Sequence, residues 1–374
     1  MQEKHLHIIC HDVPYPADYG GVFDPFYKIK ALHALGVKIH LHCFEYGRDE
    51  QPELHKYCAA VNYYSRREGH KGFSHKLPYI VCSRSNHELL DNLLKDDFPI
   101  LAEGIHCSYL LNDDRFSSRD IFLRLQNVEC LYYHELYRST SSLAKKIYYY
   151  YESRILRAYE SRIAQKAFLL AMTDEDASYY KVQFDADRIE SLPVFLPFEE
   201  VSAKAGRGCY CLYHGNLSVP ENEKAVIWLL SKVFNDLPFP LVIAGKRPSS
   251  RLSKIVRQFH HACLVADPSE SEMQDIIEKA QLHILPSFNC TGIKLKLLHA
   301  LFTGRHCIVN PQAVRGTGLE KICHIGDHAE SFKSLIEENY QQELCEGEIN
   351  KRREILLSKF DNRKNANQLI QWIW

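Results

Sequence analysis

The sequence has no long hydrophobic run and no excess of charge of either sign. No stretch of its 374 residues approaches the roughly 20 apolar residues that span a bilayer. Residues 1–16 lack the apolar core of a secretory signal. Lysine and arginine number 46 against 47 aspartates and glutamates, which excludes the strongly basic surface of a nucleic-acid-binding protein. We therefore expect a cytoplasmic protein without a nucleic-acid partner.

Metal-binding and disulfide motifs are also missing. The 20 histidines and 13 cysteines form no HExxH motif, no repeated CxxC pair and no regular Cys/His spacing. We therefore predict no metal site. An odd number of scattered cysteines is typical of free thiols in a reducing compartment rather than of a disulfide framework.

The apolar segments that are present predict two α/β domains. A chain of 374 residues with 45% hydrophobic content can bury two cores. Strand-like segments alternate with amphipathic helical ones, as in doubly wound parallel sheets, and we place an irregular linker at 193–207. Two such domains in tandem would face a ligand cleft with the carboxyl ends of their strands. The predicted strands are 5–11, 37–44, 57–63, 100–102, 121–125, 168–172, 210–213, 241–244, 262–265, 282–285 and 307–309, and the main predicted helices are 23–35, 85–94, 143–167, 222–234, 249–258, 271–280, 293–302 and 330–337, with one or two more in 350–374.

The segment 281–310 has the most specific pattern in the chain. A strand-like run leads through a polar turn that ends at Gly292 into an amphipathic helix, which Gly304 closes as a C-cap. The turn places backbone N–H groups at a helix N-terminus, where an anion is stabilised. Lys294 and Lys296 lie in the first helical turn, where a cation opposes the helix dipole. Either a bound phosphate explains these lysines, or they are solvated residues of a plain βαβ unit.

This segment resembles the donor-nucleotide segment of GT-B glycosyltransferases, the retaining group called family 4. The resemblance implies two Rossmann-like domains facing a cleft, with a nucleotide sugar as substrate and no further cofactor. The family has two glutamates eight residues apart, one near the donor sugar and one on the ribose, and this chain has Thr291 and His299 at those places. The matching residues are Pro286, Ser287, Gly292, Leu295, Lys296, Ala300, Gly304, Ile308 and Val309.

The resemblance also implies the domain organisation and the partners. We place an N-terminal acceptor domain at 1–198 and a nucleotide-sugar domain at 207–350. The last segment, 351–374, is expected to cross back to the first domain as a helix. The implied partners are a nucleotide-sugar donor and a saccharide or lipid-linked acceptor, in surface polysaccharide or glycoconjugate assembly.

The resemblance implies a diphosphate site made of backbone N–H groups and cations. A diphosphate carries about two charges at neutral pH, so one or two cations and a helix end stabilise it without a metal. A solvated surface position is the alternative for each lysine, and a plain tight turn is the alternative for the paired glycines after the first strand. The implied donor-binding residues are Gly20, Gly21, Gly215, Asn216, Lys246, Arg247, Thr291, Gly292, Lys294, Lys296 and His299.

The implied catalytic residues lie in 124–129, which resembles an Arg-x-His-Asn-x-Glu pattern. Arg124, Asn127 and Glu129 match, and Gln126 stands where the family has a histidine near the reacting centre. Glutamine can hydrogen-bond a sugar hydroxyl but cannot move a proton. In a retaining transfer, an oxygen of the donor phosphate can take the acceptor proton instead. The alternative is a polar strand end that caps a helix.

Two further features keep alternatives open. His299, when neutral, offers one donor and one acceptor nitrogen to a ribose hydroxyl, or it packs on its helix face. The aromatic and basic run 145–151 begins a long predicted helix, and it either contacts the inner membrane surface or packs its tyrosines in the core.

Two other functions also fit the sequence. The substitutions at 126, 291 and 299 favour a catalytically degenerate GT-B protein that acts as a scaffold or binding partner in glycan assembly. An epimerase acting on the nucleotide sugar itself would need acidic residues for its proton chemistry, with Glu103 and Glu129 as candidates.

Overall fold

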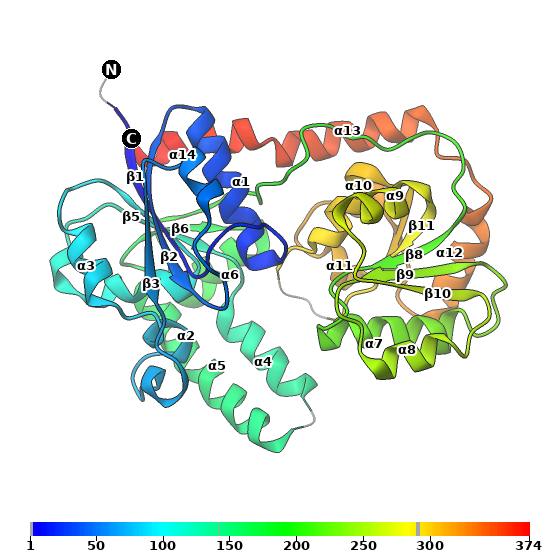
Figure 1. Cartoon of the computed structure of the whole chain (residues 1–374), viewed down its shortest axis with the longest axis horizontal. Helices are drawn as coiled ribbons and strands as arrows, with labels where there is room; N and C mark the ends of the chain where they lie inside the picture. The colour runs from blue at the N-terminus through cyan, green and yellow to red at the C-terminus, as the bar shows by residue number, and fades with distance from the viewer. Residues whose placement is uncertain (1–2, 141, 289–291) are drawn as a thin grey trace. The chain divides into compact units, whose positions relative to one another are not determined.

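The computed structural model describes residues 3–140, 142–288 and 292–374 (Figure 1). The chain divides into two compact units. Unit 1 comprises Met1–Pro197 and Phe360–Trp374, and unit 2 comprises Phe198–Lys359. Each unit is built on one parallel β-sheet. The prediction of two parallel-sheet α/β domains is therefore confirmed.

The sheet of unit 1 has the order β3-β2-β1-β4-β5-β6-β7. From β1 the chain first adds strands on one side and then crosses to the other side through β4. The topological switch point, where ligands bind in many open α/β sheets, therefore lies between β1 and β4. The strands are β1 (His5–Cys10), β2 (Lys38–Glu45), β3 (Ala60–Ser65), β4 (Ile100–Glu103), β5 (Ile121–Leu125), β6 (Phe168–Ala171) and β7 (Ile189–Ser191).

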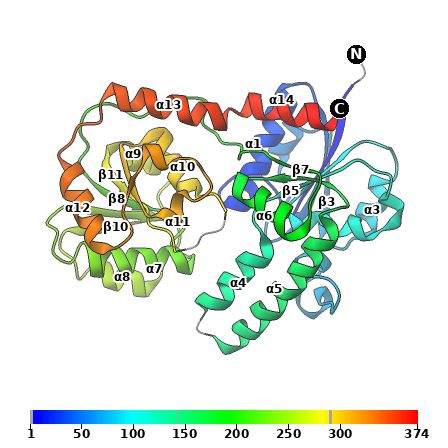
Figure 2. The ribbon, with the colours of Figure 1, turned by 180° about the vertical axis from the view of Figure 1, so that it is seen from behind.

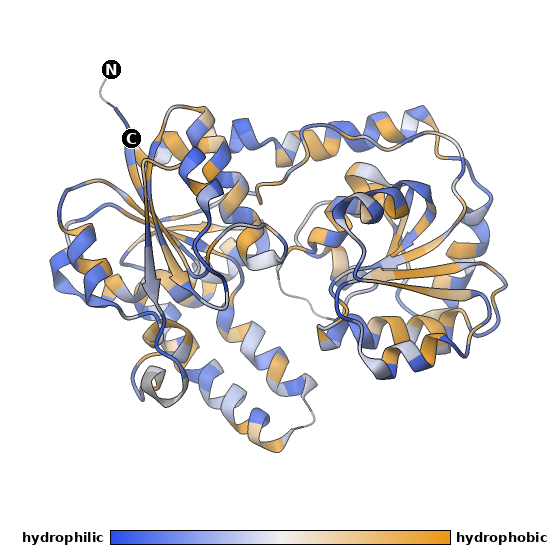
Figure 3. Ribbon diagram, viewed as in Figure 1, coloured by the Kyte–Doolittle hydropathy of each residue, from blue (hydrophilic) through white to orange (hydrophobic). Residues whose placement is uncertain are grey.

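The sheet of unit 2 repeats this order as β10-β9-β8-β11-β12-β13, so its switch point lies between β8 and β11. Figure 3 shows hydrophobic colouring along these strands, as expected of a sheet covered on both faces. The strands are β8 (Tyr210–His214), β9 (Leu241–Gly245), β10 (Ala262–Ala266), β11 (Ala280–Ile284), β12 (His306–Val309) and β13 (His324–Ile325).

Helices connect the strands in both units. The helix α14 belongs to unit 1, where it contacts α1 and sets Trp372 against Phe168 with ring centroids 5.9 Å apart (Figure 2). The helices of unit 1 are α1 (Gly20–Ala34), α2 (Tyr79–Cys82), α3 (His87–Leu93), α4 (Glu129–Ser139), α5 (Leu143–Ile163), α6 (Asp174–Phe184) and α14 (Asn362–Ile373). Those of the second half are α7 (Pro220–Trp228), α8 (Ser250–Val256), α9 (Glu270–Lys279), α10 (Leu295–Thr303), α11 (Pro311–Val314), α12 (Ala329–Tyr340) and α13 (Glu346–Phe360).

A buried ionic cluster joins α1 to the sheet of unit 1. Asp24 and Lys28, one helical turn apart, form an ion pair of 2.9 Å, and Lys28 reaches Glu103 of β4 at 2.6 Å. Arg124 of β5 pairs with Asp24 at 3.0 Å, and all four side chains are fully buried. The Arg124 guanidinium also donates to the carbonyl of Pro193, so it is a structural residue of unit 1.

Several predicted boundaries were wrong. The third strand begins at Ala60 instead of residue 57, because Tyr57 caps a 3₁₀ turn. The long helix ends at Ile163, four residues before its predicted end at 167. Gly304 is the C-cap residue of α10, as predicted, and its backbone is extended there, with φ −91° and ψ −177°. A Cβ at this position would overlap the His283 ring, so close approach explains the glycine.

Within the ranges that the structure describes, no helix is long and apolar enough to cross a membrane.

Candidate functional site

The predicted donor residues of unit 2 gather at the carboxyl edge of its sheet. Gly215 and Asn216 follow β8, Lys246 and Arg247 follow β9, and Gly292 precedes α10. A Cβ at Gly245 would overlap the Gly215 carbonyl oxygen, so the ends of β8 and β9 touch through their backbones. Parallel strands place all these loops beside the switch point.

Lys296, on α10, contacts one residue of β8 and one residue of α7. Its Nζ donates to the Tyr213 hydroxyl at 2.9 Å and to Asn222 Oδ1 at 2.9 Å. A Cβ added at Gly215 would lie 3.6 Å from Cδ of Lys296, so the lysine chain runs beside this glycine. The alternative that Lys296 is a solvated surface lysine was therefore wrong. Lys294 is the N-cap residue of α10, one position before the first turn, and its Nζ donates to the Gly292 carbonyl at 3.3 Å.

Asn222 organises the loop after β8. It lies in the first turn of α7, where its Oδ1 accepts from the Tyr213 hydroxyl at 3.0 Å and its Nδ2 donates to the Asn216 carbonyl at 2.8 Å. Neither Tyr213 nor Asn222 is among the predicted donor-binding residues, although Asn222 matches the Pro-Asn-x-x-Ala helix start of the family that the chain resembles. The signal that was available for Asn222 is its place two residues after Pro220, at the start of a helix that follows the first strand of a doubly wound domain.

Burial weakens the charge on Lys296. Desolvation, followed by repulsion from Lys294, lowers the pKa of Lys296 to about 7. Near neutral pH the side chain is therefore only partly protonated. An anion placed next to it would favour the charged form and raise this pKa, which couples anion binding to proton uptake.

The loop after β9 carries Lys246 and Arg247, and both side chains are exposed. Leu217 N–H donates to the Lys246 carbonyl at 2.9 Å, which joins this loop to the loop after β8. Arg247 has a left-handed backbone, with φ 50°, and its N–H donates to Asp267 Oδ1 at 2.7 Å. The backbone therefore brings both cations to the same edge as Gly215.

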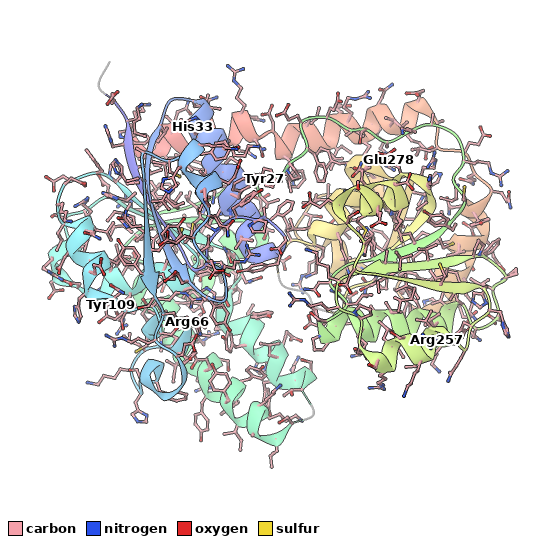
Figure 4. The ribbon with its side chains drawn as sticks, in the orientation of Figure 1. Tyr27, His33, Arg66, Tyr109, Arg257 and Glu278 are labelled. Atoms are coloured by element: carbon pink, nitrogen blue, oxygen red, sulfur yellow. The ribbon has the colours of Figure 1, made fainter. Side chains whose placement is uncertain are left out.

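His299 belongs to a chain of polar contacts on α9 and α10. Gln274 donates to Glu278, a residue labelled in Figure 4, at 2.9 Å, so the Gln274 oxygen faces His299 Nε2 at 3.1 Å. This arrangement assigns the proton of His299 to Nε2 and leaves Nδ1 as an acceptor. Burial lowers the pKa of His299 to about 4, so the ring is neutral near pH 7. Thr291, at the position of the family's other glutamate, lies outside the described residues.

The predicted residues of unit 1 gather at the carboxyl edge of the other sheet. Gln126 Nε2 donates to the Gly21 carbonyl at 3.4 Å. Gly20 is the first residue of α1. A Cβ at Gly21 would lie 2.7 Å from His11 Nε2, so the glycine admits the histidine ring that follows β1.

Two histidines that the sequence did not single out lie beside Gln126. The rings of His11 and His106 have centroids 5.1 Å apart. A Cβ at Gly104 would meet His106 Nδ1 at 3.2 Å and Gln126 Cδ at 3.7 Å. Burial, followed by the charge of Arg84, lowers the pKa of both histidines, that of His11 to about 3. Their sequence signal is their place after β1 and β4, the two strands that flank the switch point.

Glu129 and Asn127 lie at the N-terminus of α4. Asn127 Nδ2 donates to Glu129 Oε1 at 3.4 Å, and Glu160 accepts the Glu129 N–H at 2.8 Å. Burial and the neighbouring Glu160 raise the pKa of Glu129 to about 8. Glu129 is therefore mostly protonated at neutral pH, and the helix-capping carboxylate is Glu160.

No metal cluster is found in the part of the chain that the structure describes. Its His, Cys, Asp and Glu side chains form no group of three or more that could hold an ion.

Comparison with known proteins identifies the second unit. The family model described as glycosyl transferases group 1 matches residues 208–342. This part of unit 2 is therefore similar to glycosyl transferases group 1. WaaG, a glycosyltransferase involved in lipopolysaccharide biosynthesis, superposes with a TM-score of 0.67 at 12% identity, over 98% of this chain and 99% of that one. HepE of Anabaena, in complex with UDP and glucose, gives 0.66 at 10% identity, over 99% of each chain.

These superpositions show the GT-B fold for the whole chain. A curated protein of Klebsiella pneumoniae, described as an uncharacterized 44.6 kDa protein in the cps region, is 27% identical over 369 residues, which is 90% of this chain and 91% of that protein. The segment that matches the family model thus contains Gly215, Lys246, Lys296 and His299, the candidate donor site described above.

Proposed function

We propose that this protein is a retaining glycosyltransferase that moves a sugar from a nucleotide-sugar donor to a saccharide or lipid-linked acceptor. The observation that carries the proposal is Lys296, held beside Gly215 at the switch point of a glycosyl transferases group 1 domain. A partly buried cation among backbone N–H groups is suited to a diphosphate.

The donor diphosphate would be stabilised by unit 2 without a metal. The N-terminus of α10 offers backbone N–H groups, Lys296 offers a cation whose charge an anion would restore, and Lys246 and Arg247 approach from the loop after β9. These groups oppose the charge that develops on the leaving diphosphate. His299 Nδ1 can accept a hydrogen bond from a ribose hydroxyl.

The acceptor side of the reaction would use unit 1. Gln126 can orient a sugar hydroxyl by hydrogen bonds, with Asn127 beside it. In the transfer, the bond from the anomeric carbon to the phosphate oxygen breaks and a bond to the acceptor oxygen forms on the same face. The acceptor proton leaves with the phosphate oxygen, so Gln126 does not need to titrate.

We infer a role in the assembly of a surface polysaccharide or glycoconjugate. HepE was crystallised with UDP and glucose, and WaaG takes part in lipopolysaccharide biosynthesis. The Klebsiella relative is described as a protein of the cps region. Together they support a nucleotide donor of the UDP type and a glycan product.

A thermal-shift screen against UDP-, GDP-, ADP- and CMP-sugars without added metal tests the donor site. A ligand at 100 times its dissociation constant stabilises the folded state by about 2.7 kcal/mol. We expect one nucleotide class to raise Tm, and Lys296→Ala to remove the shift. The matched control is Lys232→Ala. Lys232 is an exposed lysine of unit 2 in the helical segment Leu229–Val233, which directly follows α7.

Turnover decides between catalysis and binding alone. We expect the donor found in the screen to be consumed with a saccharide or lipid-linked acceptor, and the product to keep the anomeric configuration by NMR. Cooperative melting without a shift from any donor would overturn the proposal in favour of a degenerate binding or scaffold protein. An inverted product would overturn retention alone.

A further inference from the structure

The helix α5 exposes an apolar stripe near its N-terminus. Leu143, Ile147 and Tyr151 are 73%, 54% and 63% exposed, and Tyr150 beside them is 42% exposed. Positions four residues apart share one helix face. In Figures 1 and 2, α4 and α5 lie side by side and project from the rest of unit 1, and Figure 3 shows hydrophobic colouring at the start of α5.

The four consecutive tyrosines of α5 have two different roles. Tyr148 and Tyr149 pack against Tyr133 of α4, with ring centroids 6.5 and 6.0 Å apart. Both are half-buried, so these two tyrosines pack within the α4–α5 hairpin. The core-packing interpretation is wrong for Tyr151, whose side chain is largely exposed on the stripe that Leu143 begins.

All exposed charges of α5 are positive. Its two acidic residues are buried: Glu152 accepts the Tyr79 N–H at 2.5 Å and Glu160 accepts the Glu129 N–H at 2.8 Å. The basic residues of α5 are Lys145, Lys146, Arg154, Arg157 and Arg162. A helix with one sign of surface charge stands out in a chain whose formal net charge is −1.

The position of two of these cations is unfavourable for the helix alone. Lys145 and Lys146 lie at the start of α5, which has no acidic residue in its first turn and no side-chain cap from Ser142. Cations at a helix N-terminus oppose the helix dipole. An external anionic surface next to the stripe would offset this cost.

We propose that the tip of the α4–α5 hairpin docks on an anionic lipid surface, with Leu143, Ile147 and Tyr151 entering the interface and Lys145 and Lys146 near the lipid phosphates. Apolar and aromatic residues flanked by lysines are suited to the boundary between headgroups and acyl chains. A second copy of this chain is less suited, because a two-fold interface on this face would set the same lysines against each other. The proposal does not depend on the donor site.

Sedimentation of the full chain with vesicles tests the docking. We expect binding to phosphatidylcholine vesicles that contain phosphatidylglycerol, little binding to pure phosphatidylcholine, and loss of binding as salt rises. Replacing Lys145 and Lys146 by glutamine should weaken binding by about fivefold per lysine. Leu143→Ser, Ile147→Ser and Tyr151→Ser combined should abolish it.

The matched control is Val182→Ser on α6, an apolar residue that is 74% exposed outside the stripe. It should bind vesicles as the unaltered protein does. Circular dichroism melting of each variant shows that it is folded. The proposal is overturned if the full chain does not bind anionic vesicles, if the combined serine variant binds normally, or if that variant changes only the oligomeric state in gel filtration.

Discussion

The Lys296 ammonium donates a 2.9 Å hydrogen bond to the Tyr213 hydroxyl and lies 4.6 Å from the centre of the Tyr213 ring. Because Tyr213 is fully buried at the end of β8, this contact fixes the lysine over the switch point of the sheet. Desolvation of the Lys296 side chain, followed by repulsion from Lys294, lowers the pKa of Lys296 to about 7.

Donor affinity should depend on pH through Lys296. A nucleotide-sugar diphosphate favours the protonated lysine, so its binding takes up a proton above pH 7, and affinity should fall by up to about tenfold per pH unit there. Isothermal titration between pH 6 and 9 measures this slope. In Lys296→Arg, which stays charged, the slope should disappear. An unchanged slope in that variant would show that another group titrates.

His299 should hydrogen-bond the donor ribose. If its Nδ1 accepts a ribose hydroxyl, His299→Ala should weaken binding by about two- to tenfold, the value of one hydrogen bond. Titrations with ribo- and 2′-deoxyribo-donors separate this contact from packing, because the variant should lose the preference between them. A preference that survives in His299→Ala assigns the ribose contact to another residue.

Glu129 should make the fold less stable at alkaline pH. Its folded pKa of about 8 lies above the unfolded value, so its stabilising contribution is complete below the unfolded pKa of about 4.3 and is lost as pH rises through 8. The neutral isostere Glu129→Gln removes this loss. The difference in unfolding free energy between variant and parent should therefore grow by up to about 1.4 kcal/mol per pH unit between about pH 5 and pH 8, and level off above pH 8. Urea titrations at pH 6 to 10 provide the measurement, and parallel curves would contradict it.

The buried cluster around Asp24 should be required for stability. Arg124→Met leaves the Asp24 carboxylate short of a partner in the core, and we expect a loss of about 3–5 kcal/mol in urea unfolding. Arg115→Met, which breaks ion pairs in which the arginine side chain is 49% exposed, serves as the control and should cost less than about 1 kcal/mol. Equal losses of unfolding free energy in both variants would contradict the prediction that the buried Arg124 matters more than an exposed arginine.

Gly304 should not tolerate a side chain. A methyl group there overlaps the His283 ring in the core of unit 2, so Gly304→Ala should cost about 1–3 kcal/mol of stability. Gly347→Ala is the comparison, since its new Cβ would have only Cys345 Sγ at 3.6 Å, and it should change stability by less than about 1 kcal/mol. If Gly304→Ala left the stability unchanged, β11 would have to shift to admit the methyl group.

The sequence predicted most strands of both sheets closely. The strand predicted at 121–125 matches β5, and that at 307–309 lies within β12, because a parallel strand buried on both faces is written as a continuous apolar run. The two shortest strands, β7 and β13, were missed. Three and two residues are too few to show a period.

Chain position also identified which loops carry the candidate site. Gly215, Lys246 and Gly292 each follow a predicted strand, and strand order alone places such loops at one edge. Their individual partners could not be predicted. Lys296 contacts Tyr213 and Asn222, which lie 83 and 74 residues away in the sequence, and only folding brings them together.

The sequence by itself thus determined the two parallel-sheet domains and the loops that carry the donor candidates, because both follow from local periodicity and chain order. Tertiary structure decided which partners hold Lys296, why Gly304 is a glycine, that His11 and His106 stand beside Gln126, and that one face of α5 is exposed. Burial and long-range contact set the charge and the position of these groups, and neither is encoded in short stretches of sequence.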